Sequence, residues 1–354
     1  MEPAVTAIAS YMVFILIASI LDGFWGGRGF MGRFLGPDRI AYNVANYFSK
    51  KLNKKDRSIN TLKFRGFVAT FLLMCAAGLV GALIDNIAFR TSFLTNITSQ
   101  TTAEQSLAGQ ITATVLLSLI MGQRAVLELV LHVTKLLQDP DLKEEKHRYG
   151  AARWSVERLI LRLSDGIIAN LFLILLGLYS GIGGFAALFA FRILSVTIAS
   201  GAPSGVEGPI SPYYTYPRYG FTLITYIPAK ITGLLLAVAA LFTPTGTLHG
   251  FKAILNPRPK NYSYRLLRAR AVPMAVMAHA FNLSFKINPD TNNLDNWLGP
   301  KDGKARLGPE DLKKIIHTSL IMIMLVGLLV SLIALIDLGA FATNAEIFGI
   351  QLNF

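Results

Sequence analysis

The stretch over residues 153–166 holds the side chains of this chain that are best suited to chemistry. It reads RWSVERLILRLSDG and places two carboxylates, Glu157 and Asp165, among the arginines Arg153, Arg158 and Arg162. Carboxylates hold divalent cations and arginine forks bind phosphate, so this combination could clamp a metal and a phosphate at a membrane surface. The same charges could instead form a basic belt, in which an Arg153–Glu157 pair at i, i+4 contributes only about 0.3–0.5 kcal/mol. Spacing alone favours the belt.

Residue counts and spacing argue against several other chemistries. The five histidines include no H-E-x-x-H pattern and no pair at i, i+4, so a metal held by histidines is not expected. The single cysteine, Cys75, lies in an apolar run and can form neither a disulfide framework nor a multi-thiolate site within one chain. Segment 299–304 reads GPKDGK, which lacks the glycine spacing and the preceding strand of a phosphate loop. We expect a solvated turn there, followed by a helix over 309–318.

Membrane helices are the elements that must position these groups. Hydrophobic residues make up 53% of the chain and charged residues only 16%, below the roughly 25% of a soluble domain. A span needs about 20 apolar residues. The clearest spans are Val5–Leu21, Phe67–Ile84 and Thr318–Phe341, and the weaker candidates are Ala108–Met121, Ile167–Leu178, Ile182–Ala199 and Phe221–Phe242. The sequence therefore predicts an all-α, polytopic integral membrane protein that forms a single domain over 1–354.

The net charge of +13 is concentrated in three segments. Of the 34 lysines and arginines, ten lie in 22–66, eight in 123–166 and twelve in 251–317. This distribution follows the positive-inside bias of cytoplasmic loops, and it accounts for the basic charge without a nucleic-acid partner.

These basic segments also predict a topology. If all three lie in the cytoplasm, the chain must cross the membrane an even number of times between 166 and 251, where three candidate spans are present. The best choice for a re-entrant or interfacial segment is Phe221–Phe242, because Pro228 and Lys230 would be costly in lipid. We therefore expect six spans with both termini outside.

Three further segments carry structural predictions. Arg39–Leu52 is expected to be a helix at the cytoplasmic interface, and Ala125–Leu137 a helix that continues the third span. Segment 201–220 is rich in glycine, proline and tyrosine and predicts a loop, either a hinge with interfacial tyrosines or a functional loop. Gly177 and Gly181 predict close helix packing at a turn.

Several short elements carry a family resemblance. They are LDGFWG over 21–26 with GPDRI over 36–40, the eight-residue separation of Glu157 from Asp165-Gly166, YIPAKIT over 226–232, VMAHAF over 276–281, and LG over 298–299 with PEDL over 309–312. With gaps, over most of the chain, these elements resemble the CobD/CbiB family of membrane proteins. Its members are the adenosylcobinamide-phosphate synthases of cobalamin biosynthesis, and the AmpE-like proteins are distant relatives.

The resemblance implies an enzyme of the bacterial inner membrane that joins cobyric acid to an aminopropanol phosphate, with ATP and Mg²⁺. It assigns catalysis and Mg²⁺ binding to Glu157 and Asp165. It assigns binding of the corrinoid and phosphate groups to Arg153, Arg162, Lys230, Asp22 and Arg39. The family motif E-x-x-x-E-N-x-x-D-G is incomplete here, because its second Glu-Asn falls on Leu161-Arg162.

A second function class stays open, because acidic residues are scarce beyond the motif. Between Gly166 and Pro289 the one acidic residue is Glu207, although a site for Mg²⁺ and ATP needs several carboxylates. The alternative is a non-catalytic membrane subunit or signalling protein that sits in lipid and binds a protein partner through its cytoplasmic loops. A transporter is less favoured, because the strong spans hold few ionisable residues.

Overall fold

The computed structural model describes residues 37–54, 56–89, 155–180, 182–200, 211–255, 268–286 and 297–347, with separate helical residues within 15–22, 114–118 and 128–135. Its elements are α3 (Pro37–Leu52), α4 (Ile59–Phe89), a helix over 155–162 that continues as the π-helix η1 (Leu163–Ile168) and then as α9 (Ala169–Tyr179), α10 (Gly184–Ser200), the 3₁₀ turn η2 (Pro212–Tyr214), α11 (Thr215–Leu241), α12 (His249–Leu255), α13 (Arg268–Ala280), β1 (Phe285–Lys286), β2 (Trp297–Leu298) and α14 (Pro309–Ile347). The two strands pair antiparallel.

Within the described part of the chain, four helices are long and apolar enough to cross a membrane. They are Ile59–Asn86, Ser155–Gly177, Pro212–Leu241 and Glu310–Leu332. This result confirms a mostly helical chain with several candidate membrane spans. Some helices continue beyond the predicted apolar runs, and the helix expected over 309–318 is continuous with the last predicted span. The spans predicted over Val5–Leu21 and Ala108–Met121 lie mostly outside the described residues.

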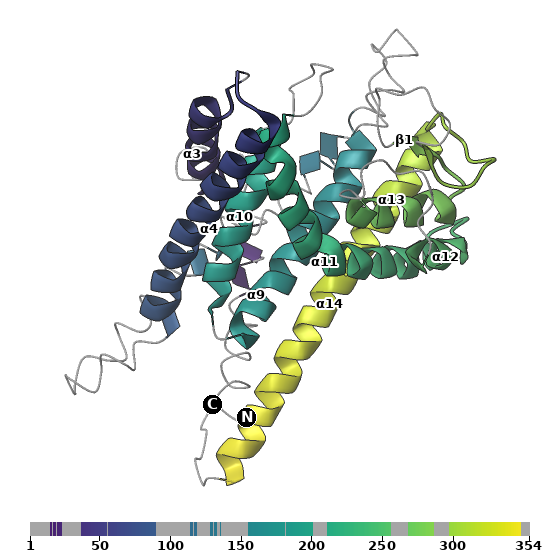
Figure 1. The fold of residues 1–354 in the computed structure, drawn as a ribbon. Coiled ribbons are helices and arrows are strands. Elements are labelled where there is room, and N and C mark those ends of the chain that lie inside the picture. Colours follow the sequence, from purple (N-terminus) through teal and green to yellow (C-terminus); the bar gives the residue numbers. More distant parts are fainter. Residues whose placement is uncertain are drawn as a thin grey trace.

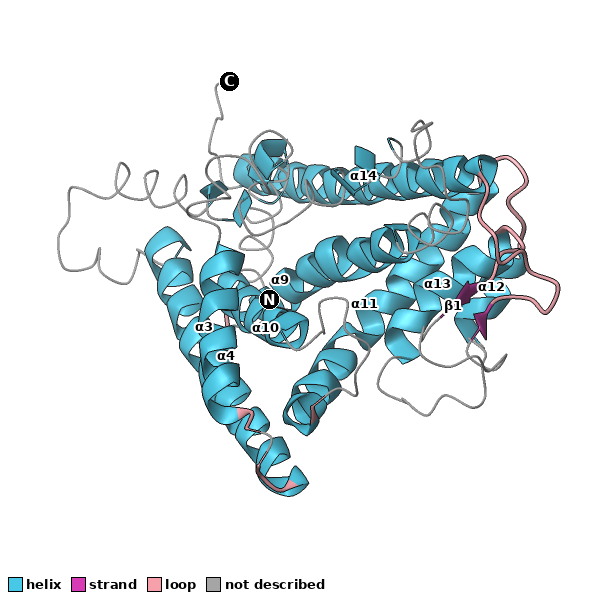
Figure 2. Ribbon diagram, turned by 90° about the horizontal axis from the view of Figure 1, so that it is seen from above, coloured by secondary structure: helices cyan, strands magenta, loops and turns pink. Residues whose placement is uncertain are grey.

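Three long helices run in the same direction. The helices α4, 155–179 and α14 all descend from the top to the bottom of Figure 1, whereas α10 runs back beside α4. In the chain, each of these three helices comes after one of the three basic segments. Because the helices run in the same direction, their starts lie on one side of the molecule. This is the arrangement expected if the basic segments share the cytoplasmic side. Seen from above, α9, α10 and α11 lie between α4 and α14 (Figure 2).

Both ends of α11 lie near the starts of other helices. A Cβ on Gly66 of α4 would be 1.8 Å from the carbonyl oxygen of Tyr213, so the backbone before α11 touches the first part of α4. Beyond the other end, Thr243 Oγ1 lies 2.9 Å from Thr318 Oγ1, near the start of α14. The re-entrant assignment of Phe221–Phe242 stays a prediction. The length and composition of α11 would also allow a crossing, so the count of six spans stays a prediction.

Two segments are more ordered than predicted. From Pro212 onward the expected loop 201–220 is helical, and Tyr213 and Tyr214 are buried, with the Tyr214 hydroxyl hydrogen-bonded to Ser49 Oγ of α3. The part over 201–210 lies outside the described residues. Segment 251–317 is not only a basic loop, because it contains α13, whose residues 271–278 are all buried. Sequence patterns missed both features, because proline, glycine and basic residues dominate their local composition.

The C-terminal part of α4 holds the start of α10. Asp85 is 5% exposed, and its carboxylate accepts hydrogen bonds from the backbone N–H of Phe185, at 3.1 and 3.3 Å, and of Ala186, at 3.2 Å. These are orphan donors of a helix N-terminus, which an acidic side chain normally satisfies from its own chain segment. The close helix packing predicted at Gly177 is confirmed, because a Cβ there would lie 2.3 Å from the Gly183 carbonyl oxygen.

Replacing Asp85 with alanine should therefore destabilise the α4–α10 pair. We expect a loss of about 1–2 kcal/mol, the usual cost of removing a helix cap, measured as the unfolding free energy in detergent. The matched control is Asn86→Ala, because Asn86 is the next residue of the same helix and is exposed. Equal effects of the two substitutions would show that the carboxylate does not stabilise the start of α10.

Candidate active site

One helix carries a charged stripe along an otherwise buried surface. Over residues 155–166, the side chains that keep some exposure are Glu157, Arg158, Leu161, Arg162 and Asp165, and every other residue is buried. Their spacing of i, i+1, i+4, i+5 and i+8 places them on one face of the helix. We call these five residues the charged stripe. The structure thus brings the two predicted carboxylates and Arg162 onto one accessible face.

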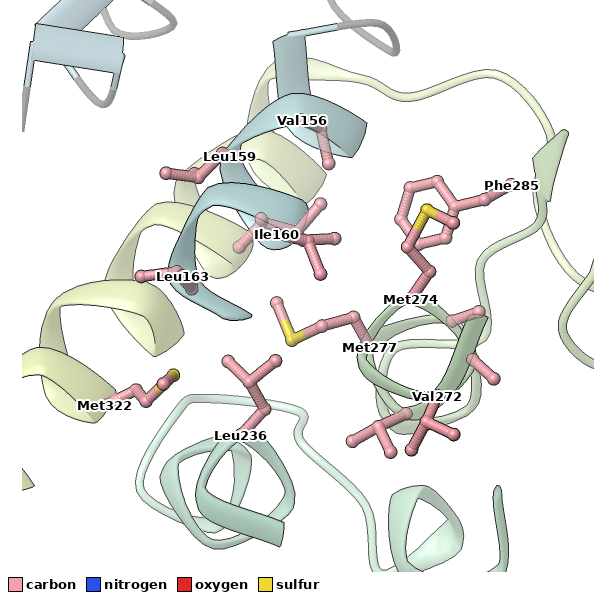
Figure 3. Packing of buried hydrophobic residues seen from close by; sticks show 14 of the residues in the cluster. Val156, Leu159, Ile160, Leu163, Leu236, Val272, Met274, Met277, Phe285 and Met322 are labelled. Atoms are coloured by element: carbon pink, nitrogen blue, oxygen red, sulfur yellow. The ribbon is translucent and has the colours of Figure 1, made fainter. Parts of the chain in front are cut away.

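The rest of this helix is fixed by the main hydrophobic core. Figure 3 shows Val156, Leu159, Ile160 and Leu163 facing residues of α11, α13 and α14. Met277 of α13 is 0% exposed and reaches between Ile160 and Leu236. In the apolar 18-residue window of the candidate span Ser155–Gly177, 61% of the residues are buried, against 17% in the corresponding window of Ile59–Asn86. The charged stripe therefore belongs to the most enclosed of the four candidate spans, where ionisable side chains usually line a functional site rather than face lipid.

The end of the charged stripe lies in a π-helix. Asp165 is in its first turn, and the backbone N–H of Ala169 donates to the carbonyl oxygen of Ser164, five residues earlier. The Asn170 side-chain amide donates to the Gly166 carbonyl oxygen at 2.8 Å, which supplies a further donor where the helical ladder is widened. Single π turns inside α-helices are frequent at functional sites. The Asp-Gly pair that the sequence singled out is thus also the point where the backbone departs from α-helical geometry.

The spacing along the helix limits how the carboxylates can hold a metal. Eight residues separate Glu157 from Asp165, which corresponds to roughly 12 Å along the axis at about 1.5 Å per residue. Mg²⁺ ligands lie about 2.0–2.1 Å from the ion, so this separation disfavours direct binding of one ion by both carboxylates. The described residues contain no group of three or more histidine, cysteine or acidic side chains that could hold a metal. A bound Mg²⁺ would have to complete its coordination shell with water and substrate phosphate, as Mg²⁺ usually does in proteins.

The other predicted site residues are not gathered at the charged stripe. Lys230 lies on the exposed side of α11, where its Nζ is 4.7 Å from the centre of the Tyr226 ring. Arg39 is exposed on α3, which contacts α4 and α10 at the left of Figure 1. Asp22 is fully buried. Arg153 lies outside the described residues.

Sequence reasoning assigned no individual site role to two side chains of this region. Arg158 lies four residues before Arg162 and seven before Asp165, a spacing that would have placed it on the same face. Ser164 is fully buried, and its Oγ has no hydrogen-bond partner within the part of the chain that the structure describes. No sequence signal marks this hydroxyl, because its burial depends on the packing of neighbouring helices.

Comparison with known proteins shows what the chain is similar to. No protein-family model matches the chain, and no solved structure matches it. Curated proteins named "Cobalamin biosynthesis protein CobD" do match. Those of Brucella suis biovar 1 and Brucella melitensis biotype 1 are each 26% identical over 263 residues, which cover 68% of this chain and 70% of the relative. That of Brucella anthropi is 25% identical over 251 residues, covering 66% and 69%. The chain is thus a distant relative in sequence of these CobD proteins, and the similarity extends over about two thirds of its length.

Two elements that resemble the CobD family pack behind the helix that carries the charged stripe. The YIPAKIT element lies in α11, where Pro228, Ala229 and Thr232 are buried and Thr232 Oγ1 donates to the Pro228 carbonyl oxygen at 2.8 Å. The VMAHAF element lies mostly in α13, which packs against α11. The family elements of α11 and α13 therefore form the scaffold behind the stripe.

Proposed function

We propose that this distant relative of the CobD proteins is an amide-forming synthase of the adenosylcobinamide-phosphate type, with its active site at the charged stripe. The reaction would first transfer the γ-phosphoryl group of ATP to a carboxylate of the corrinoid, which releases ADP and forms an acyl phosphate. The amine of an aminopropanol phosphate would then attack the acyl carbon, and phosphate would leave as the amide forms. The observation that carries this proposal is one accessible face that holds two carboxylates and two arginines on the most enclosed candidate span.

The residues of the stripe suit this chemistry. Arg158 and Arg162 offer planar donor forks for phosphate or carboxylate oxygens. Glu157 and Asp165 are hard oxygen ligands for Mg²⁺, which offsets the charge of a transferring phosphoryl group when it is bound. The amine must lose a proton as it attacks, and whichever carboxylate lies beside it is a suitable acceptor.

Cobalamin-dependent growth tests this proposal. Deletion of the gene should abolish growth that depends on cobalamin synthesis, and wild type should restore it, whereas Glu157→Gln should not. The variant must be present in membranes at the wild-type level for the comparison to count. Unimpaired growth of the deletion strain without added cobalamin would overturn the proposal.

A non-catalytic role is the second candidate, favoured by the single acidic residue, Glu207, between Gly166 and Pro289. In that case the protein would bind a partner through its basic cytoplasmic segments. Purification in mild detergent should then recover a partner in fixed stoichiometry. A solitary protein that hydrolyses ATP in the presence of corrinoid would favour the synthase.

We further propose a multi-pass topology in the bacterial inner membrane, with the basic segments in the cytoplasm. A single cysteine at Lys301 or Asp302, in the exposed turn before α14, should then be protected from an impermeant maleimide in intact cells and react after permeabilisation. The background is Cys75→Ala, because Cys75 is exposed. Labelling in intact cells would reverse the orientation.

A further inference from the structure

The junction between α3 and α4 concentrates basic charge with few acids beside it. Segment 50–65, which we call the basic elbow, reads KKLNKKDRSINTLKFR and contains a single acidic residue, Asp56. The carboxylate of Asp56 lies 3.9 Å from the guanidinium Nε of the next residue. Lys50, Lys51 and Lys54 are exposed at the end of α3 and just beyond it. The basic elbow therefore presents a strongly positive surface.

The basic elbow is held in place at both of its ends. At the start of α4, Ser58 Oγ accepts a hydrogen bond from the backbone N–H of Thr61 at 3.3 Å, as a helix-capping side chain does. After α3, the Asn53 side-chain oxygen accepts a hydrogen bond from Ser211 Oγ, before α11, at 2.6 Å. These bonds fix the turn against the neighbouring helices, so its lysines project from a defined position.

The basic elbow ends where an uncharged run of α4 begins. Residues 66–84 contain no charged side chain, and Arg65 and Asp85 flank them. At about 1.5 Å per residue this run rises roughly 28 Å, which matches the roughly 30 Å thickness of a hydrocarbon core. Arg65 therefore falls at the boundary between hydrocarbon and headgroups. This placement does not depend on which side of the membrane the basic elbow faces.

The end of α3 lies at the same boundary. Leu52 packs against the buried cluster of Ala69, Tyr213 and Tyr214, so it lies beside the first turn of the uncharged run of α4. The lysines on either side of Leu52 are thus at the level of the headgroups.

Exposed aromatic side chains run from the basic elbow along the outside of α4. Phe64, Phe67 and Phe71 are all exposed, and their spacing of i, i+3 and i+7 places them on one face. Tyr216 of α11 is exposed as well and meets Phe67 edge-to-face, with ring centres 5.9 Å apart. Both views place α3 and α4 at one edge of the described helices (Figures 1 and 2). Aromatic rings in such positions are typical of a membrane interface.

The combination of charge and apolar surface selects the kind of ligand. Cations at the headgroup level and an apolar face that continues along a candidate span suit a molecule that is anionic at one end and apolar at the other. A nucleic acid or an acidic protein would use the cations but not the phenylalanine face.

We propose that the basic elbow binds anionic phospholipid, with the phosphate headgroups on its lysines and arginines and the acyl chains along the exposed phenylalanines of α4. Clusters of four to eight lysines and arginines beside a membrane helix are suited to anionic lipid, and each contributes about fivefold in affinity. This binding is separate from the proposed synthase activity and would hold for a non-catalytic protein as well.

A lipid titration of the protein in neutral detergent tests this proposal. Native mass spectrometry should show phosphatidylglycerol bound more tightly than phosphatidylcholine. The triple variant Lys50→Gln, Lys51→Gln and Lys54→Gln should bind phosphatidylglycerol about 100-fold more weakly, with its binding of phosphatidylcholine unchanged. All three lysines are exposed, so the variant should keep the wild-type unfolding midpoint without added lipid. Equal affinity of the wild-type protein for the two lipids would overturn the proposal.

The matched control removes the same charge elsewhere. Lys301→Gln, Arg306→Gln and Lys313→Gln alter exposed residues before and within the first turns of α14, and this variant should keep the tight phosphatidylglycerol site. If both triple variants lose binding equally, the lipid responds only to net charge and the basic elbow is not a specific site.

Two further outcomes would assign the surface to another ligand. Inorganic phosphate should not displace phosphatidylglycerol when compared with chloride at equal ionic strength, because it cannot use the apolar face. Displacement would show a site for a free anion and overturn the lipid proposal. A dimer in neutral detergent that the basic elbow variant cannot form would assign the surface to a second copy of the chain and would also overturn it. None of these measurements uses catalysis, so they are independent of the growth test.

Discussion

In the Asp165→Asn variant, amide formation is expected to fall by about 100-fold or more, while the protein inserts and folds as wild type does. The substitution keeps the size of the side chain and removes the negative charge at the π-helical end of the charged stripe. A metal that offsets phosphoryl charge is worth several kcal/mol in the transition state, and about 2.7 kcal/mol corresponds to 100-fold in rate.

The Mg²⁺ dependence of the variant gives a more specific readout than its rate. If Asp165 helps to hold the ion, the Mg²⁺ concentration for half-maximal activity should rise, and Asp165→Glu should recover part of the loss. The matched control is Asp302→Asn, because Asp302 is exposed in a turn before α14. An unchanged Mg²⁺ dependence in an active Asp165→Asn protein would remove this residue from the metal site.

The second large effect is expected from the core behind the stripe. Met277→Ala should destabilise the protein by about 3 kcal/mol, because truncating a fully buried methionine removes its contacts and leaves a cavity. Met277 is 0% exposed and lies between Ile160 and Leu236 (Figure 3). Since Ile160 is on the helix that carries the charged stripe, activity should fall together with stability.

The matched control for this variant is Met324→Ala. Met324 is 65% exposed on α14, so the same truncation there should change the unfolding midpoint little. Similar losses from the two substitutions would mean that α13 does not support the site helix through this contact.

The apolar, helical character of the long segments followed from the sequence, whereas the cytoplasmic side of the basic segments stays a prediction. Long apolar runs and an uneven distribution of lysine and arginine are properties of composition, and they act on each helix separately. The helix α3 and the helical core of each described span could be predicted for the same reason. The ends of the helices could not be predicted, because the length of an apolar run marks only the part of a helix that is compatible with lipid. The helices α4 and α14 continue beyond that part through polar residues.

The candidate site was only partly visible in the sequence. Glu157 and Asp165 could be selected by their spacing, which is a local property of one helix. The tertiary structure decided which neighbours share their exposed face, because the burial of Val156, Leu159 and Ile160 depends on α11, α13 and α14.

Tertiary structure alone also decided two features that no local pattern encodes. The π turn at Asp165 arises within a helix held on most of its surface by other helices. Tyr213 and Tyr214 are buried because α3 and α4 pack against the 3₁₀ turn that contains them. The sequence by itself determined which parts of the chain are apolar enough for lipid and in which segments the basic residues gather, because both depend on local composition. The packing of helices determined which charged groups can meet, because that depends on direction and register between separate segments.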